Sequence, residues 1–360
     1  MSPTTKNAEQ RFLELIAGPP RSLSERIQRG LLRIASWVYR CGVAFRNTLF
    51  DLGLKRSHAA PFPVISVGNL TTGGTGKTPV VAMLVRMLKE VGHRPGIISR
   101  GYRELSGGGN DEARVLELLC PGTPHVQNRD RVLAAHRVAE KQAGADDGCT
   151  AIIADDAFQH RRLKRDLDIV LIDALNPFGH DALLPRGLLR EPVSSLRRAD
   201  VVILTRADLV DEASRTAIWQ IVKANNRAAA RVELSFMPAG LVDKAGKQHA
   251  DEKANVLAFC GIGNPDGFRK TLAAAEIPIQ DLIAFPDHHH YDQDDIQKLV
   301  ATAEKLEAKV LITTLKDLVK IEPAWAGSAE VVALNIEAQV TSGKELLAEA
   351  ISKATPRPNR

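Results

Sequence analysis

The first patterned stretch of the chain is a long amphipathic segment near the N-terminus. Ser22 and Glu25 have the spacing of a capping box, so we expect a helix from Leu23 to about Phe45. Apolar residues recur at steps of three and four, which places them on one helical face: Leu23, Ile27, Leu31, Ile34, Val38, Cys41 and Phe45. Arginines keep the same rhythm on a neighbouring face: Arg26, Arg29, Arg33 and Arg40.

Beyond residue 60 the pattern changes to short apolar runs that alternate with amphipathic segments. This alternation is typical of a parallel sheet with helices on both faces. The predicted strands are 63–68, 95–102, 150–157, 166–174 and 200–208, and the predicted helices are 78–92, 111–120, 129–142 and 212–225. The alternation restarts with strands at 255–263, 279–286, 310–317 and 331–336 and helices at 265–276, 293–308 and 343–353.

The pattern divides the chain into four parts and predicts the α/β fold class. We expect an N-terminal helical segment at 1–60, an α/β core at 61–230, a β linker at 231–254 and a smaller C-terminal α/β domain at 255–360. A chain of 360 residues, of which 44% are hydrophobic and 25% charged, can bury two such cores and is not a disordered protein.

Composition bears on the compartment. The four cysteines are far apart and form no CxxC pair, which argues against a disulfide scaffold or a zinc ribbon and favours the cytoplasm. The first residues lack a basic stretch that leads into an apolar core, so we expect no signal peptide. No apolar run approaches the roughly 18 residues that a membrane-spanning helix needs.

The net charge of +5 is located at the N-terminus. Residues 1–60 hold 10 Lys and Arg against 4 Asp and Glu, whereas the remainder holds 38 against 39. A local basic excess argues against nucleic acid as a partner and for a contact with an anionic surface. Trp37 and Tyr39 suit a membrane–water interface, so the helix is predicted to lie on an anionic membrane. The alternative is that its apolar face packs on the protein's own core.

The segment GNLTTGGTGKTP, residues 68–79, lies between a predicted strand and a predicted helix. Glycines let backbone N–H groups converge on phosphate oxygens, and the helix N-terminus adds its positive end. Lys77 would reach the β- and γ-phosphates, and the Thr78 hydroxyl would bind Mg²⁺. Thr71 replaces the first glycine of GxxxxGK[ST], but the GGxGKT core is intact. The predicted nucleoside triphosphate site comprises Thr71, Thr72, Gly73, Gly74, Thr75, Gly76, Lys77 and Thr78.

Carboxylates at the ends of predicted elements are candidates for holding the metal. Asp155 and Asp156 end a buried strand, where a Walker-B-type strand presents a Mg²⁺ ligand. Asp111 and Glu112 head a helix, and Glu191 precedes a proline. Each of these groups also has a structural interpretation as a helix cap or a turn residue.

A second motif keeps another class of protein open. Leu204-Thr205-Arg206-Ala207-Asp208, at the end of a predicted strand, resembles the guanine-reading [NT]KxD motif of GTPases. Arg206 replaces the usual lysine. A membrane-associated switch GTPase or ATPase with a P-loop is therefore the alternative to a kinase.

Ten motifs spread over both halves follow one order. They are GNLTTGGTGKTP, SRGY (99–102), DE (111–112), DDAFQH (155–160), RDLDIVLID (165–173), NPFG (176–179), LLPRGLLREP (183–192), GIGNP (261–265), FPDHHHY (285–291) and TTLKDLVK (313–320). Over about residues 60–320 the chain thereby resembles the tetraacyldisaccharide 4'-kinases, the lipid A kinases of Gram-negative bacteria.

The resemblance implies an activity and a location. The family phosphorylates the 4'-hydroxyl of a tetraacylated glucosamine disaccharide 1-phosphate, a lipid A precursor, with ATP and Mg²⁺ at the cytoplasmic face of the inner membrane. It implies a peripheral enzyme without a membrane span. The implied fold is a P-loop NTPase-like parallel sheet with helices on both faces, joined by a short β linker to a smaller C-terminal α/β domain.

The resemblance also implies roles for particular residues. Asp111 and His288 would form a catalytic dyad that takes the proton of the acceptor hydroxyl, and Lys77 would be the third catalytic residue. The expected metal ligands, direct or through water, are Thr78, Glu112, Asp155, Asp156 and Glu191. Contacts to phosphates or the disaccharide are expected from Arg100, Tyr102, His160 and Arg190.

The chain departs from the family pattern in three motifs. It has Ala157 within DDAFQ where the family has DDGFQ, Asn110 and Ala113 flanking DE where the family has GDEP, and TTLKD for TTEKD. None of these changes removes a group that phosphoryl transfer needs. The consecutive histidines 288–290 point in different directions, so we do not expect them to chelate a metal.

Overall fold

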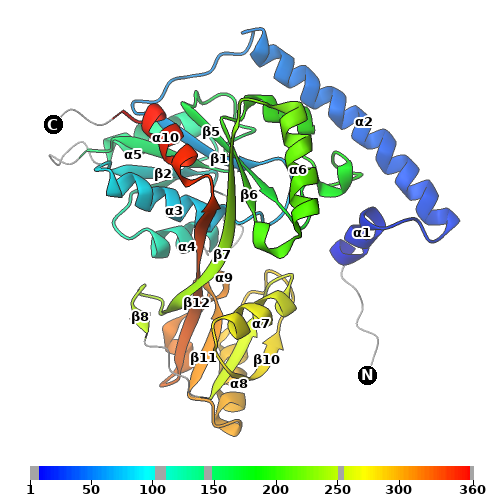
Figure 1. Ribbon diagram of the computed structural model, residues 1–360. Coiled ribbons are helices and arrows are strands. Elements are labelled where there is room, and N and C mark those ends of the chain that lie inside the picture. The colour runs from blue at the N-terminus through cyan, green and yellow to red at the C-terminus, as the bar shows by residue number, and fades with distance from the viewer. Residues whose placement is uncertain (1–7, 102–110, 142–147, 250–254, 357–360) are drawn as a thin grey trace.

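The computed structural model describes residues 8–101, 111–141, 148–249 and 255–356 (Figure 1). Its strands form one 12-stranded sheet in the order β10-β9-β11-β12-β7-β6-β5-β1-β4-β2-β3, with β8 paired to β7. The strands are β1 Val64–Asn69, β2 Pro95–Ser99, β3 His125–Gln127, β4 Ala151–Asp155, β5 Leu167–Asp173, β6 Val201–Thr205, β7 Ala230–Val242, β8 Gln248–His249, β9 Val256–Cys260, β10 Ile279–Ala284, β11 Val310–Thr314 and β12 Glu330–Ser342. The α-helices are α1 Ala8–Ala17, α2 Leu23–Asp51, α3 Lys77–Glu90, α4 Asp111–Leu119, α5 Arg131–Glu140, α6 Glu212–Asn225, α7 Pro265–Ala274, α8 Gln293–Lys305, α9 Leu315–Leu318 and α10 Lys344–Ala354.

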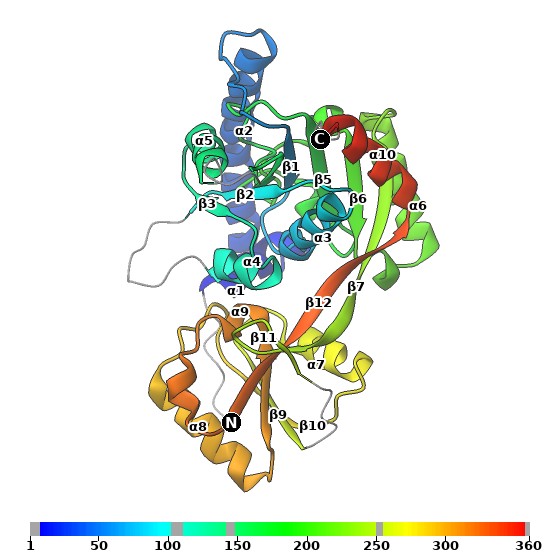
Figure 2. The same ribbon diagram turned by 90° about the vertical axis from the view of Figure 1, so that its left-hand side faces the viewer.

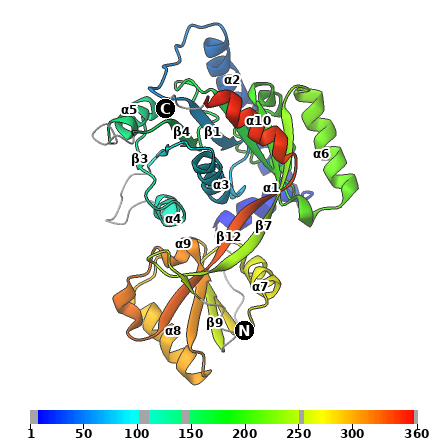
Figure 3. The same ribbon diagram turned by 60° about the vertical axis from the view of Figure 1, so that its left-hand side comes forward.

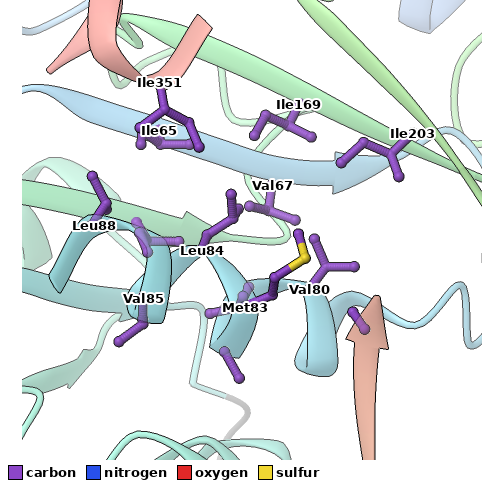
Figure 4. Close-up of a cluster of buried hydrophobic side chains, with 14 of the residues drawn as sticks. Ile65, Val67, Val80, Met83, Leu84, Val85, Leu88, Ile169, Ile203 and Ile351 are labelled. Carbon is purple, nitrogen blue, oxygen red and sulfur yellow. The ribbon is translucent and has the colours of Figure 1, made fainter. Parts of the chain in front are cut away.

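In the first half, the strands from β3 to β7 run parallel and carry helices on both faces, which confirms the predicted P-loop NTPase-like architecture. Alternate residues of each strand serve opposite faces. Ile65 of β1 packs under α3 with Leu84 and Ile169 (Figure 4), whereas neighbouring Val64 packs with α5. Because both faces are covered, these strands read as continuous apolar runs, which is why the sequence pattern located them well.

The second half is a smaller α/β unit. Its strands β10, β9, β11 and β12 are parallel, with α7 packed on one face and α8 on the other. The antiparallel pair of β7 and β12 connects the halves (Figures 2 and 3). Each of these strands has 13 residues. At about 3.3 Å per residue, one strand spans about 40 Å. The predicted linker at 231–254 is therefore only one of two connecting strands.

The last helix does not stay with the second half. After β12 the chain has returned to the first half, where Leu347 and Ile351 of α10 are buried in the core under β1, β5 and β7. Figure 1 shows α10 in red beside α3. The expected C-terminal domain at 255–360 therefore included a helix that packs on the opposite core. Burial of two apolar side chains there decides its place.

The N-terminal helix begins where predicted and extends farther. The Ser22 side chain accepts the N–H of Glu25 at 3.2 Å, as the capping spacing indicated, and α2 continues to Asp51. Along the side of the first half, α2 docks through a face that carries Ser36, Val43 and Asn47 (Figure 1). The Ser36 hydroxyl donates to the Leu183 carbonyl at 2.8 Å.

The predicted apolar face of α2 lies on the outside. All of its residues are exposed, and the exposed fractions of its six large apolar side chains run from 58% at Ile27 to 73% at Leu23. We call this set the exposed stripe: Leu23, Ile27, Leu31, Ile34, Val38, Cys41 and Phe45. The alternative that this face packs on the protein's own core is therefore wrong. Among the described residues, no helix has the length and apolarity that a membrane crossing requires.

Candidate active site

The loop between β1 and α3 adopts the strand–loop–helix geometry of a phosphate-binding loop. Gly76 caps α3 with a φ of 81°, and a side chain there would meet the Phe236 ring at 2.1 Å, so only glycine fits. Lys77 is the first residue of the helix, where backbone N–H groups and the helix dipole favour an anion. The Thr72 N–H donates to the Leu188 carbonyl at 2.8 Å, which ties the loop to the segment before Arg190.

Acidic side chains meet Lys77 at the carboxyl edge of the sheet. Its ammonium lies 3.3 Å from Asn69 Oδ1 at the end of β1 and 3.6 Å from Asp156 Oδ1, just past the end of neighbouring β4. Arg190 Nη1 contacts both oxygens of Asp156 at 2.9 Å. Burial alone would raise the pKa of Asp156, but the positive charges of Lys77 and Arg190 outweigh it and lower that pKa. Asp156 is therefore ionised beside the loop.

Asp155 is the buried member of the pair. Its Oδ1 has no hydrogen-bond partner among the described residues. Burial raises the pKa of this carboxyl to about 7; Lys77 opposes that shift, and the charges of Asp156 and Glu112 add to it. A buried carboxylate without a partner is costly unless a cation approaches it. A metal ion bound at Asp155 would supply that cation.

The donor set fits Mg²⁺ bound together with a nucleotide. Thr78 follows Lys77 on α3. Asp155 is the last residue of β4, and Asp156 follows it. Glu112 lies near enough for its charge to raise the pKa of Asp155. Within the described ranges, no group of three or more acidic, histidine or cysteine side chains could hold a metal without other ligands. Mg²⁺ ordinarily takes one or two carboxylates and completes its octahedron with phosphates and water, so this small set is sufficient.

Glu191 has partners of its own beside the phosphate loop. Its side chain is fully buried and accepts from Arg198 Nη2 at 2.6 Å, from Asn47 Nδ2 at 3.3 Å and from Arg46. These contacts fasten α2 to the first half. The N–H of the neighbouring Arg190 donates to the Leu70 carbonyl at 2.7 Å, next to the loop. The role of Glu191 as a metal ligand therefore stays a prediction.

The expected catalytic dyad of Asp111 and His288 lies where the two halves approach each other. Asp111 is the first residue of α4, and Lys320 of the second half reaches its carboxylate at 3.9 Å. His288 lies in the loop after β10 with a φ of 57°, and its N–H donates to the Gly261 carbonyl at 3.1 Å. Both residues are described, and no hydrogen bond or ion pair joins their side chains. The dyad is not assembled in this arrangement of the halves.

The other histidines of the run have separate roles. His289 is bonded to Asp295 Oδ2 at 2.7 Å and stacks on Phe285 with ring centroids 4.6 Å apart. His290 is exposed. The consecutive histidines 288–290 therefore have three different surroundings.

Of the residues expected to contact substrate, Arg190 lies near the loop, since its N–H donates to the Leu70 carbonyl at 2.7 Å, His160 lies beside Arg131, and Tyr102 falls outside the described residues. Gln159, next to His160, donates to the Asn69 carbonyl at 2.8 Å. Burial and the positive charge of Arg131 together lower the pKa of His160 to about 4, so this imidazole is neutral at physiological pH. A neutral imidazole can donate one hydrogen bond and accept another.

Sequence reasoning missed some residues of the site. Asn69 contacts Lys77, and buried Arg131 donates to the Asp155 carbonyl at 3.0 Å from the start of α5. Lys320 lies in the TTLKDLVK motif, and its ammonium donates to buried Asp317 at 3.3 Å. The signal in the sequence is the spacing of three between Asp317 and Lys320 within that motif. No motif of the sequence marks Arg131.

Comparisons with known proteins agree with one another. The family model described as Tetraacyldisaccharide-1-P 4'-kinase matches residues 28–355. The tetraacyldisaccharide 4'-kinase of Syntrophus aciditrophicus is 39% identical over 342 residues, 87% of this chain and 90% of that protein. That of Anaeromyxobacter sp. (strain Fw109-5) is 37% identical over 347 residues, 91% of each chain. The crystal structure of "apo" form LpxK from Aquifex aeolicus in complex with ATP shares 29% identity and a TM-score of 0.72, covering 91% of this chain and 99% of that one.

Proposed function

This chain belongs to the tetraacyldisaccharide-1-P 4'-kinase family, and from that membership we propose how its residues carry out the reaction. The reaction is phosphoryl transfer to the 4'-hydroxyl of a tetraacylated disaccharide 1-phosphate in lipid A synthesis. ATP is the phosphoryl donor, as the complex of the Aquifex aeolicus protein with ATP supports. The observation that carries the assignment is Lys77 at the start of α3, within 3.6 Å of a carboxylate at the end of β4.

Phosphoryl transfer depends mainly on positioning and on neutralising charge. Lys77 would hold the β- and γ-phosphates, together with backbone N–H groups of the loop and of the start of α3. Thr78, Asp155 and Asp156 would hold Mg²⁺, and Glu112 would contact it through water. When bound, the metal would supply charge neutralisation at the phosphates.

The acceptor hydroxyl requires a base, and we assign it to Asp111 with His288. Asp111 takes the proton of the 4'-hydroxyl and becomes a neutral carboxylic acid, and the imidazole of His288 orients Asp111 and can accept that proton from it as an imidazolium. Since the side chains are not joined in this arrangement, the halves approach further when substrates bind. The β7–β12 pair is the connection about which that approach occurs.

The kinase assignment is tested by labelled ATP and a tetraacyldisaccharide 1-phosphate dispersed in detergent. The expected result is label on the lipid, with kcat reduced about 10²- to 10³-fold in K77A, because one transition-state contact of this kind contributes about 3–4 kcal/mol. K89A, a lysine farther along the same helix that contacts the Pro121 carbonyl, is the matched control. Folded K77A with full activity contradicts the assignment.

The GTPase alternative is not favoured. In a guanine-reading motif the basic residue and the aspartate face the nucleoside base. Here the Arg206 guanidinium is engaged by Asp173 at 2.6 Å and by the Gly74 carbonyl. We expect ATP to support faster transfer than GTP in a competition assay. Faster transfer from GTP would restore the alternative.

We propose that α2 attaches the enzyme to the cytoplasmic face of the inner membrane. The substrate carries four acyl chains and stays in the bilayer, so the enzyme must reach the surface. The exposed stripe supplies apolar contact, and exposed Arg26, Arg33 and Arg40 supply attraction to anionic lipid. Arg29 is not counted among these membrane-facing arginines, because it donates to the carbonyls of Leu15 and Gly18 and so holds α1 against α2.

Vesicle binding tests this attachment. Replacing Ile34 and Val38 by Ser should weaken sedimentation with vesicles of anionic phospholipid. R26Q/R33Q should weaken it as well, and raised salt should weaken binding of the wild type more than that of R26Q/R33Q, which has fewer charges to screen. I221S, on exposed α6 of the same half, is the matched control. Activity on substrate dispersed in detergent should change little in all of these variants. Unchanged vesicle binding in the Ile34 and Val38 variant would assign membrane contact to another surface.

A further inference from the structure

The motif at the end of β6 contacts the phosphate loop directly. Parallel strands β6, β5 and β1 lie side by side, so their carboxyl ends meet at one edge. The hydroxyl of buried Thr205 donates to the Thr75 carbonyl at 3.1 Å and lies 3.3 Å from the Ile172 carbonyl. The next residue, Arg206, has a φ of 55°, an uncommon conformation for a side chain of this size.

The Arg206 guanidinium has three partners. Nη1 and Nη2 donate together to the Gly74 carbonyl at 3.2 and 3.1 Å. Nη1 also lies 2.6 Å from Asp173 Oδ2 at the end of β5. The guanidinium carbon of Arg206 lies 5.5 Å from the centroid of the Phe236 ring, which also excludes any side chain at Gly76.

We infer that Arg206 is a positioning residue of the nucleotide site, which holds the phosphate loop in its binding shape from the side away from the phosphates. The carbonyl and N–H of a peptide group point in opposite directions. When Arg206 holds the Gly74 carbonyl, the N–H of the same peptide, that of Thr75, turns the other way and donates to the Gly73 carbonyl at 3.1 Å, which closes a turn within the loop. When Thr205 holds the Thr75 carbonyl, the N–H of Gly76 turns to the opposite side of the loop. Glycines at 73, 74 and 76 would otherwise let these peptides rotate at little cost.

This role concerns the same nucleotide site, so it rests on the proposed function only in that ATP must bind the loop. It predicts that losing Arg206 weakens triphosphate binding while leaving the lipid site alone. Lysine at 206 would keep the charge beside Asp173 but could not make the forked contact with the Gly74 carbonyl.

The experiment measures ATP affinity by calorimetry and the two KM values for R206Q, R206K and the control R86Q. Arg86 forms an ion pair of 2.6 Å with Glu337 in the same half without touching the loop. The expected result is that R206Q raises Kd and KM for ATP about tenfold, or about 1.4 kcal/mol, with the KM for lipid unchanged. R206K should fall between, and R86Q should match the wild type.

Two further variants keep the test decisive. D173N should weaken ATP binding less than R206Q, and the double variant should resemble R206Q, since Asp173 acts through Arg206. T205V removes the hydroxyl that holds the Thr75 carbonyl and should also weaken ATP binding. It replaces R206Q as the test variant if R206Q does not fold. Wild-type ATP affinity in folded R206Q, or in both R206K and T205V, overturns the inference. Wild-type protein that binds ATP but does not phosphorylate lipid would instead contradict the proposed function and leave the role of Arg206 testable.

Discussion

Replacing Asp155 by Asn should stabilise the nucleotide-free protein while it removes activity. Asp155 is buried, and burial raises its pKa from the ordinary 3.8 to about 7. Between these values the folded protein keeps a proton that the unfolded chain has lost. Stability contributed by protonated Asp155 is therefore complete below about pH 4, falls as pH rises and is gone above about pH 7. An amide at this position does not titrate, so it avoids that loss.

The magnitude follows from the shift. About three pKa units at 1.36 kcal/mol each amount to about 4 kcal/mol of unfolding free energy above pH 7. For a chain of 360 residues, an unfolding entropy of about 2.1 cal/mol/K per residue converts this to a Tm about 5 °C higher. The same variant should lose phosphoryl transfer, because a carboxamide is a poor substitute for a carboxylate as a Mg²⁺ ligand.

Thermal unfolding from pH 4 to pH 8 without nucleotide measures the effect. The Tm difference between D155N and the wild type should be near zero at pH 4 and grow towards pH 8. D208N replaces an exposed aspartate at the carboxyl end of neighbouring strands and should match the wild type throughout. A D155N difference that does not vary with pH, or one equal to that of D208N, refutes the reasoning. Retained kinase activity in D155N would remove Asp155 from the metal site.

Two further predictions concern residues that the structure separates from this carboxylate. E191A leaves Arg198 buried without its counter-charge and should lower the unfolding free energy by about 3–5 kcal/mol, measured by urea unfolding. D51N, which removes a carboxylate that is 38% exposed from its pairs with Arg161 and Arg197, should cost less. A changed Mg²⁺ requirement in folded E191A would support its predicted role as a metal ligand. D111A and H288A should each reduce kcat, and the double variant should lose little more than the worse single one, because residues that act as a unit are non-additive. Multiplicative losses in steady-state kinetics would mean that the two act independently.

Features that depend on neighbours along the chain could be predicted from sequence. The start of α2 at Leu23 follows from a capping contact between Ser22 and Glu25, which are three residues apart in sequence. The phosphate loop follows from glycines next to a strand and a helix, and from Lys77 at the helix start. Buried strands such as β1 and β5 are marked by apolar runs, because both of their faces are covered. In each case the physical cause lies within one element or at its boundary.

Only the tertiary structure decided which groups meet. The amphipathic pattern of α2 identified an apolar face but could not say that the opposite face docks, because Ser36 and Asn47 find their partners in residues 183–191. Glu191 is a predicted metal ligand, and the sequence could not show that folding also places it against Arg198 and Arg46. A carboxylate suits a metal and an arginine equally well, and its partners depend on contacts between residues far apart in sequence. The same long-range pairing returns α10 to the first core and sets Arg206 on the phosphate loop.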